Sequence, residues 1–503
     1  MSLARIFSRA QVGVQAPEVI VEVHLGNGLP AFHIVGLPEA SVKEAKDRVR
    51  SALENSQFGF PDQRITVNLA PADLPKDGGR FDLAIAVGIL VASGQIVCPD
   101  IHRYEFYGEL ALNGEVRGVN AILPSVLGAK EKGRCCFLPA ENDTLASLVS
   151  GVSRKAIYSI QDVWNDLLNQ QPLPLNIEYP EQQIERDSIY DLSDVKGQPG
   201  AKRVLEIAAA GGHNLLFLGP PGTGKSMLAQ RMPSIMPTMS DDEAISTAAL
   251  YSIIGQSVDL SKWRERPFRN PHHTCSAVAL VGGSSNPKPG EISLAHNGVL
   301  FLDELPEFER KVLDSLREPM ETGVVTISRA ARQMEFPSQF QLIAALNPSP
   351  TGSHTDKRAT PDQVLRYLSR VSGPFIDRID LQIELPRLTS AQLQSTEPEE
   401  SSQQVRKRVE RAHALQHARQ GKVNARLNNK EMNRYCELAA AELQFLARAS
   451  EKLALSPRSY HRVIKVARTI SDLKEQPTIT LSELKEALNY RAFERLISQL
   501  TQF

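Results

Sequence analysis

Cysteine is scarce in this sequence, and neither sign of charge is in excess. Only 5 of the 503 residues are cysteine, and no two of them have the CxxC spacing of a metal or redox motif. So sparse a set excludes a disulfide framework and is typical of reduced thiols, so we expect a cytoplasmic protein. Lys and Arg total 57 against 58 Asp and Glu, a net charge of −1. A generally basic nucleic-acid coat is therefore excluded, and any contact with a polyanion must be local.

Long apolar segments are also absent. The longest apolar run, residues 81–92, is shorter than the ~20 residues that span a bilayer, and it favours a buried helix. The first residues lack the apolar core of a signal peptide. With 42% hydrophobic and 23% charged residues, the composition is that of a globular protein. We therefore expect a soluble protein that makes no membrane contact.

Changes in composition divide the chain into five segments. Residues 1–164 contain short stretches in which apolar and polar positions alternate, and they predict an α/β domain. Residues 165–189 are rich in Gln, Asn and Pro and predict a linker. Residues 190–389 hold uninterrupted apolar runs, which are typical of a parallel sheet with helices on both faces. A polar, acidic hinge at 390–404 precedes residues 405–503, whose periodicity predicts helices.

An eight-residue segment matches the phosphate-binding pattern G-x-x-x-x-G-K-[ST]. It consists of Gly219, Pro220, Pro221, Gly222, Thr223, Gly224, Lys225 and Ser226. Glycines let consecutive backbone N–H groups curl round a phosphate, while Lys225 reaches the β- and γ-phosphates and the Ser226 hydroxyl ligates Mg²⁺. The apolar run 214–218 enters the loop, and a helix is expected after it. The segment therefore predicts a site for ATP and Mg²⁺.

Two carboxylates follow a second apolar run, residues 299–302. At the carboxyl end of a strand beside the phosphate loop, Asp303 can hold the Mg²⁺ shell. Glu304 points in a different direction and can polarise the attacking water. This pattern is weak alone, but together with the phosphate loop it predicts an ATPase.

Motif for motif, the chain resembles the ComM/YifB family, in the magnesium-chelatase-like branch of AAA+ ATPases. The matching segments are the phosphate loop and residues 194–198, 208–213, 269–274, 289–296 and 300–308. The resemblance implies a P-loop AAA+ module with a C-terminal helical lid. It also implies a hexameric DNA helicase that uses Mg-ATP to migrate branched recombination intermediates during natural transformation, binding branched or single-stranded DNA. The alternative is a protein-remodelling ATPase, like the magnesium-chelatase motor subunit, that acts on a protein partner.

The resemblance also implies roles for residues outside the phosphate loop. Asn347 looks like sensor 1, which orients water against the γ-phosphate. Arg378 looks like an arginine finger offered to a neighbouring subunit, and Arg458 looks like sensor 2; a capping or salt-bridge arginine is the alternative for each. A finger supplied in trans requires a ring, and such rings are usually hexamers. Arg329 lies in a segment similar to the pore hairpin of MCM helicases, where it either grips DNA phosphates or is an ordinary surface arginine.

The first domain resembles the Lon-type protease fold but departs from its catalytic pattern. Residues 74–78 match the approach to the nucleophile of that family, yet Arg80 stands at the serine position and Leu123 at the lysine position. Without a hydroxyl and an amine, Ser–Lys acyl transfer cannot run. We therefore expect a catalytically inactive domain that binds a partner or substrate.

Two further clusters admit more than one interpretation. His272 and His273 suggest a metal site, but neighbouring residues on an extended chain point to opposite faces, which disfavours it. Residues 405–430 hold eight Lys or Arg against one acid, Glu410. A solvated helix face that docks on the acidic hinge is favoured there over a DNA contact.

Overall fold

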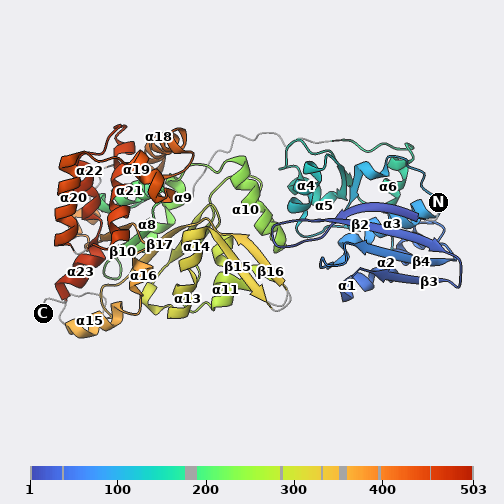
Figure 1. Cartoon of the computed structure of the whole chain (residues 1–503), viewed down its shortest axis with the longest axis horizontal. Coiled ribbons are helices and arrows are strands. Elements are labelled where there is room, and N and C mark those ends of the chain that lie inside the picture. The colour runs from blue at the N-terminus through green and yellow to red at the C-terminus, as the bar shows by residue number, and fades with distance from the viewer. Residues whose placement is uncertain are drawn as a thin grey trace. The chain divides into compact units, whose positions relative to one another are not determined.

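The computed structural model describes residues 3–36, 39–175, 190–283, 287–329, 332–350, 359–394, 398–453 and 455–500. The chain forms two compact units (Figure 1). The first unit comprises Met1–Ile184, Asp241–Trp263 and Ala330–Glu335, and the second comprises Glu185–Ser240, Arg264–Arg329 and Phe336–Phe503. Among the described residues, no helix combines the length and apolarity needed to cross a membrane.

The first unit is built on a seven-stranded mixed sheet in the order β3-β4-β2-β1-β5-β8-β9. Its strands are β1 (Leu3–Arg9), β2 (Glu18–Gly26), β3 (Ala31–Val35), β4 (Arg64–Ala70), β5 (Tyr104–Phe106), β8 (Cys135–Pro139) and β9 (Arg154–Ile157). Alternating positions of β2 are buried because successive side chains of a strand point to opposite faces. The apolar run 81–92 forms the buried helix α3 (Asp82–Ala92) against this sheet, as predicted.

A helix from the middle of the chain completes the first unit. Helix α10 (Asp241–Ile253) packs on α4 (Ile122–Glu131), where Ala248 and Ala249 are buried in one apolar cluster with Leu123. The Ala121 N–H donates to the Ser252 carbonyl at 2.9 Å. The predicted boundaries kept 190–389 in one domain, so the structure differs here. Apolar periodicity indicates that a helix face is buried, but it does not indicate which domain covers that face.

The second unit contains a five-stranded parallel sheet in the order β11-β14-β17-β10-β18. Its strands are β11 (Phe268–Arg269), β14 (Val299–Leu302), β17 (Gln341–Leu346), β10 (Leu215–Leu218) and β18 (Leu381–Glu384). Every residue of β10, β14 and β17 is buried, which confirms the parallel sheet predicted from the apolar runs. Because the strands are parallel, their carboxyl ends meet at one edge of the sheet.

Helices cover this sheet and continue to the carboxyl end of the described chain. They include α7 (Pro199–Gly211), α8 (Lys225–Gln230), α9 (Met232–Ile235), α18 (Ser402–Gln420), α19 (Asn429–Tyr435), α20 (Ala440–Lys452), α21 (Pro457–Leu473), α22 (Leu481–Asn489) and α23 (Ala492–Leu500). Helices α18 and α21 pack on α7 and share one apolar core with the sheet. The predicted helical region is confirmed, and the helix α17 (Ser390–Gln394) begins the segment predicted as a hinge.

Candidate nucleotide-binding site

Three of the predicted site segments meet at the carboxyl edge of the five-stranded sheet. The phosphate loop follows β10, Asp303 follows β14, and Asn347 follows β17. Lys225 Nζ donates to Asn347 Oδ1 at 3.1 Å, although 122 residues separate them in sequence. Ser226 Oγ donates to Asp303 Oδ2 at 2.6 Å. The fold therefore brings the predicted phosphate-binding and metal-binding side chains into one cluster.

Two glycines shape the phosphate loop. A Cβ on Gly219 would lie 2.8 Å from the Leu385 carbonyl oxygen, so only glycine fits where the loop leaves β10. Gly224, the residue before α8, has φ of 88°, a left-handed conformation that favours glycine. A Cβ on Gly224 would meet open space. The loop thus closes tightly at its base and leaves room at its helix end, where a phosphate group would bind.

The charge of Lys225 is directed into the loop. Its Nζ also donates to the carbonyl oxygens of Gly219 at 2.8 Å and Pro220 at 3.0 Å. Burial lowers the pKa of Lys225, and the carboxylates of Asp303 and Glu304 oppose that shift. Its hydrogen bonds are to neutral acceptors, so a phosphate would supply a charged partner. The adjacent Ser226 and Asp303 oxygens are ligand types that Mg²⁺ prefers, so the side chains fit a Mg-triphosphate.

The Glu304 carboxylate lies beside a histidine. Its φ of 53° is left-handed, which is uncommon for a residue with a side chain and marks a strained position. Glu304 Oε2 lies 3.2 Å from His273 Nδ1, and the carboxylate is about half exposed. The His273 ring lies tilted against that of His272 and meets the ring of Phe308 edge-on. The structure thus pairs His273 with a carboxylate that sequence reasoning missed. The sequence feature that could have indicated this pair is the position of His273 just after β11, the strand beside β14.

Arg378 lies at the amino ends of the strands of the same sheet, opposite the carboxyl ends that carry the phosphate loop. Strand β18 runs parallel to β10, with Leu381 opposite Leu215 and Glu384 opposite Leu218. The phosphate loop leaves the carboxyl end of β10, whereas Arg378 precedes the amino end of β18. A strand of four residues separates these two edges by ~10 Å before any loop is counted. Arg378 is therefore separated from the phosphate loop of its own chain.

Arg458 is positioned beside Arg378, near the start of α21. Ser456 Oγ, at the cap of this helix, donates to Asp377 Oδ1 at 3.4 Å. One turn after Arg458, Arg462 forms an ion pair with Asp380. Both anchors join α21 to the segment that carries Arg378. The structure thus brings these two predicted arginines together, away from the Lys225 cluster.

The predicted pore hairpin forms a two-stranded sheet of β15 (Val324–Arg329) and β16 (Arg332–Pro337). Residues 330–331 and the side chain of Arg329 lie outside the described part of the chain. The position of the Arg329 guanidinium therefore stays a prediction.

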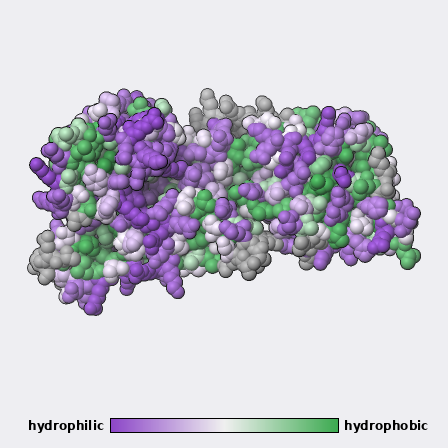
Figure 2. All heavy atoms as spheres, viewed as in Figure 1, coloured by the Kyte–Doolittle hydropathy of each residue, from purple (hydrophilic) through white to green (hydrophobic). Residues whose placement is uncertain are grey.

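Several cations of the 405–430 segment make structural contacts, although Figure 2 shows hydrophilic residues prevailing at the surface around α18 and α19. Arg408 forms ion pairs with Glu206 on α7 and with Glu400 in the predicted hinge. Arg406 Nε donates to the Ser234 carbonyl at 2.8 Å. These contacts support the interpretation of α18 as a helix docked on the hinge and on α7.

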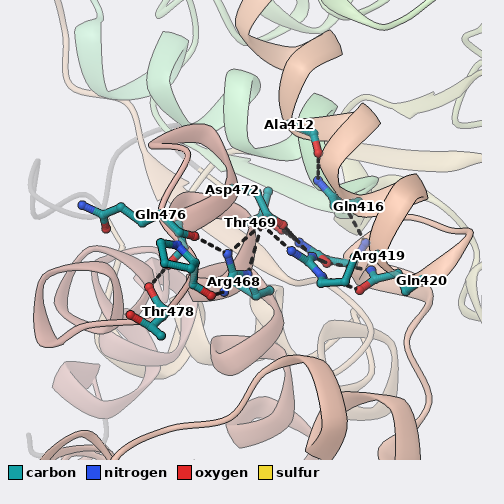
Figure 3. Close-up of polar contacts among 12 residues, drawn as sticks. Ala412, Gln416, Arg419, Gln420, Arg468, Thr469, Asp472, Gln476 and Thr478 are labelled. Atoms are coloured by element: carbon teal, nitrogen blue, oxygen red, sulfur yellow. Dashed lines mark hydrogen bonds and ion pairs between the residues drawn. The ribbon is translucent and has the colours of Figure 1, made fainter.

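Asp472 on α21 is clamped by two arginines (Figure 3). It is 1% exposed, accepts two hydrogen bonds from Arg419 at 2.7 and 2.8 Å, and accepts from Arg468 Nη2 at 2.7 Å. Asp472→Ala would leave the buried Arg468 and the partly exposed Arg419 without their shared carboxylate, so we expect it to lower the free energy of unfolding by about 3–5 kcal/mol. Urea unfolding followed by circular dichroism measures this. Glu410→Ala removes an exposed carboxylate from α18 as a control, and equal midpoints for the two variants would contradict the prediction.

In the first unit, Arg80 and Leu123, the two positions predicted to replace a Lon-type serine and lysine, are filled by buried side chains. Arg80 Nη2 donates to Ser125 Oγ at 3.0 Å, and burial lowers the pKa of Arg80 to about 10. Leu123 is fully buried in the cluster that joins α4 to α10. Both side chains contribute to the packing of the first unit.

Comparisons with known proteins cover both units. A family model described as magnesium chelatase, subunit ChlI, matches residues 191–393, and the models for subunit ChlI of Mg-chelatase and for its C-terminal part match residues 21–142 and 399–491. Lon protease 2 of Bacillus subtilis is 26% identical over 151 residues, which cover 29% of this chain and 27% of that protein.

Full-length relatives are much more similar. The competence protein ComM of Haemophilus influenzae is 54% identical over 507 residues, covering 100% of both chains. YifB of Escherichia coli is 48% identical over 503 residues, covering 99% of both chains. The parallel sheet with its phosphate loop, the C-terminal helices and these full-length matches lead to one conclusion: the chain belongs to the ComM/YifB family of magnesium-chelatase-like AAA+ proteins.

Proposed function

We propose that this protein is an Mg-ATP-dependent ring ATPase that translocates on DNA and promotes branch migration of recombination intermediates during natural transformation. The observation that carries the ATPase is the convergence of Lys225, Ser226, Asp303 and Asn347 at one sheet edge. The name of the ComM relative refers to competence, and we extend that role to this chain. The ring is a homo-hexamer that works in the cytoplasm.

The side chains divide the hydrolysis step between them. Lys225 neutralises charge on the β- and γ-phosphates, while Ser226 and Asp303 hold Mg²⁺, which offsets phosphate charge when it is bound. Glu304 accepts a hydrogen bond from the attacking water, and Asn347 orients that water against the γ-phosphate. The phosphate loop and Arg378 lie at opposite ends of the paired strands β10 and β18, which supports our proposal that a neighbouring chain supplies the arginine. A guanidinium suits this place because negative charge spreads over the γ-phosphate oxygens in the transition state.

We assign the DNA contact to the β15–β16 hairpin. A hairpin that projects into the pore of a ring can hold a strand through its phosphates without reading bases, and Arg329 is our candidate cation for that contact. The second candidate function, remodelling of a protein partner, is favoured by the matches to the ChlI models over 191–393 and 399–491. The two functions differ in the polymer that should stimulate ATP hydrolysis.

An ATPase assay with and without forked or four-way DNA separates these functions. We expect branched DNA at low salt to raise turnover about fivefold or more, and rising salt to weaken the effect because phosphate contacts release counterions. Arg329→Ala should reduce the stimulation and spare turnover without DNA. A wild-type rate that does not change with DNA at low salt would favour the protein-remodelling function.

A further inference from the structure

The guanidinium of Arg378 is enclosed within its own chain. Its side chain is 6% exposed, and Nη2 forms an ion pair with Glu321 Oε1 at 2.6 Å. Nη1 donates to the Pro374 carbonyl at 2.6 Å. Nε is buried and has no hydrogen-bond partner among the described residues. If Arg378 acts on a phosphate of another chain, its guanidinium is already occupied by contacts within its own chain. Glu321 is its carboxylate partner in those contacts.

Glu321 stands among several cations. The charges of Arg317, Arg458 and Arg462 all act on Arg378; burial is the main cause that lowers the pKa of Arg378, and only Glu321 opposes the shift. Arg317 pairs with Asp314 and Arg462 with Asp380, but the Nε atom of each is buried without a hydrogen-bond partner in the described structure. Like charges brought this close favour the arrival of an anion. Until an anion arrives from outside, Glu321 is the carboxylate that compensates Arg378.

Glu321 also lies at the root of the hairpin. It belongs to the last turn of α14 (Arg317–Thr322), which ends at Gly323 with φ of 71° and passes directly into β15 (Figure 1). The Glu321 side chain is 48% exposed, so it can leave Arg378 for water without a large desolvation change. A displacement of β15 would move α14 and with it the Glu321 carboxylate.

We propose that Glu321 is a positioning residue that latches Arg378 to its own chain, and that movement of the β15–β16 hairpin opens this latch. The inference rests on the proposed function, because it takes Arg378 as the arginine that acts in trans. When the latch opens, Nη2 of Arg378 donates its hydrogen bond to a γ-phosphate oxygen bound by the neighbouring subunit instead of to Glu321. The carboxylate and the phosphate therefore compete for one guanidinium. Hydrolysis is held back in each subunit until its neighbour's hairpin is engaged.

The test is the steady-state ATPase activity of the full-length protein without DNA. Glu321→Gln removes the charge that competes for Arg378, so we expect kcat to rise roughly threefold to tenfold with little change in KM, because the arginine stabilises the transition state. The double variant Glu321→Gln with Arg378→Ala should lose this gain, since the effect must pass through Arg378. The matched control is Glu318→Gln, one turn earlier on α14, which is exposed and makes no ion pair with a described residue; it should keep the wild-type rate.

The outcomes distinguish the latch from the proposed function. If Arg378→Ala abolishes turnover while Glu321→Gln matches or falls below the wild type, the latch is overturned and the trans arginine stands. A gain in Glu321→Gln that survives the loss of Arg378 also overturns the latch. If Arg378→Ala keeps wild-type turnover both without DNA and with branched DNA, where the latch should be open, the trans arginine itself is wrong, and the latch with it. Thermal melting of each variant shows that these rates are compared between folded proteins.

Discussion

Glu304→Gln is expected to bind Mg-ATP as the wild type does while hydrolysing it about 10²- to 10⁴-fold more slowly. Glutamine keeps the shape of the side chain but cannot accept the proton of the attacking water. Lys225, Ser226 and Asp303, which would hold the triphosphate and its metal, stay intact and keep their contacts. ATP binding measured by calorimetry and turnover measured by phosphate release separate the two effects.

A neighbouring acid provides the control for this variant. Glu307→Gln changes a carboxylate in the turn that follows Glu304, but Glu307 pairs with Arg370 at 3.3 Å and not with the phosphate-loop cluster. We expect it to retain turnover within about twofold of the wild type. Normal turnover in Glu304→Gln would show that another group activates the water.

The second large effect is complementation between two inactive variants. Lys225→Ala should fail to bind nucleotide, because the loop loses the cation that reaches the phosphates. Arg378→Ala should bind nucleotide but hydrolyse it very slowly, because the neighbouring site loses its transition-state charge. When the two are mixed, an intact Lys225 from one chain can meet an intact Arg378 from the next. Random mixing makes about one quarter of the interfaces complete, so activity should return toward that fraction.

The control for complementation is a mixture of Lys225→Ala with Glu304→Gln. Both residues lie on the nucleotide-binding side of a single chain, so no interface in that mixture is complete and no activity should return. Mixed assembly is verified by pulling down one variant through a tag and detecting the other. Mixed rings of Lys225→Ala and Arg378→Ala that stay inactive would remove Arg378 from the proposed mechanism.

The phosphate loop could be predicted because its chemistry is local in sequence. Eight consecutive residues carry the glycines, the lysine and the hydroxyl, and the apolar run before them is the strand that the motif requires. Asp303 could be predicted almost as well, because it follows a buried strand beside the loop, whereas Asn347 came from the family resemblance. The hydrogen bonds of these residues to Ser226 and Lys225 are seen only in the structure.

The partners of side chains that meet across elements could not be predicted in the same way. The sequence suggests a disfavoured metal site at His273, because it shows the neighbour His272 and not the β11–β14 pairing that brings Glu304 to His273. The role of Glu321 could not be predicted from the sequence, because one acid in a helix is usually a surface residue. Its importance depends on Arg378, which the fold places beside it. Single-sequence patterns report which face of an element is buried, and contact partners depend on the topology.

The place of α10 governs how the protein can be divided for expression. A truncated chain that starts at residue 190 would keep α10 but lose α4, and the surface around Ala248 and Ala249 would become an exposed patch prone to self-association. The two ends of the segment that contains α10 lie close together, because the Met239 N–H donates to the Arg264 carbonyl at 3.2 Å. A short glycine-serine bridge from 239 to 264 can therefore replace the whole segment in a shortened ATPase, whereas a separate N-terminal domain would need residues 241–253 supplied as a peptide.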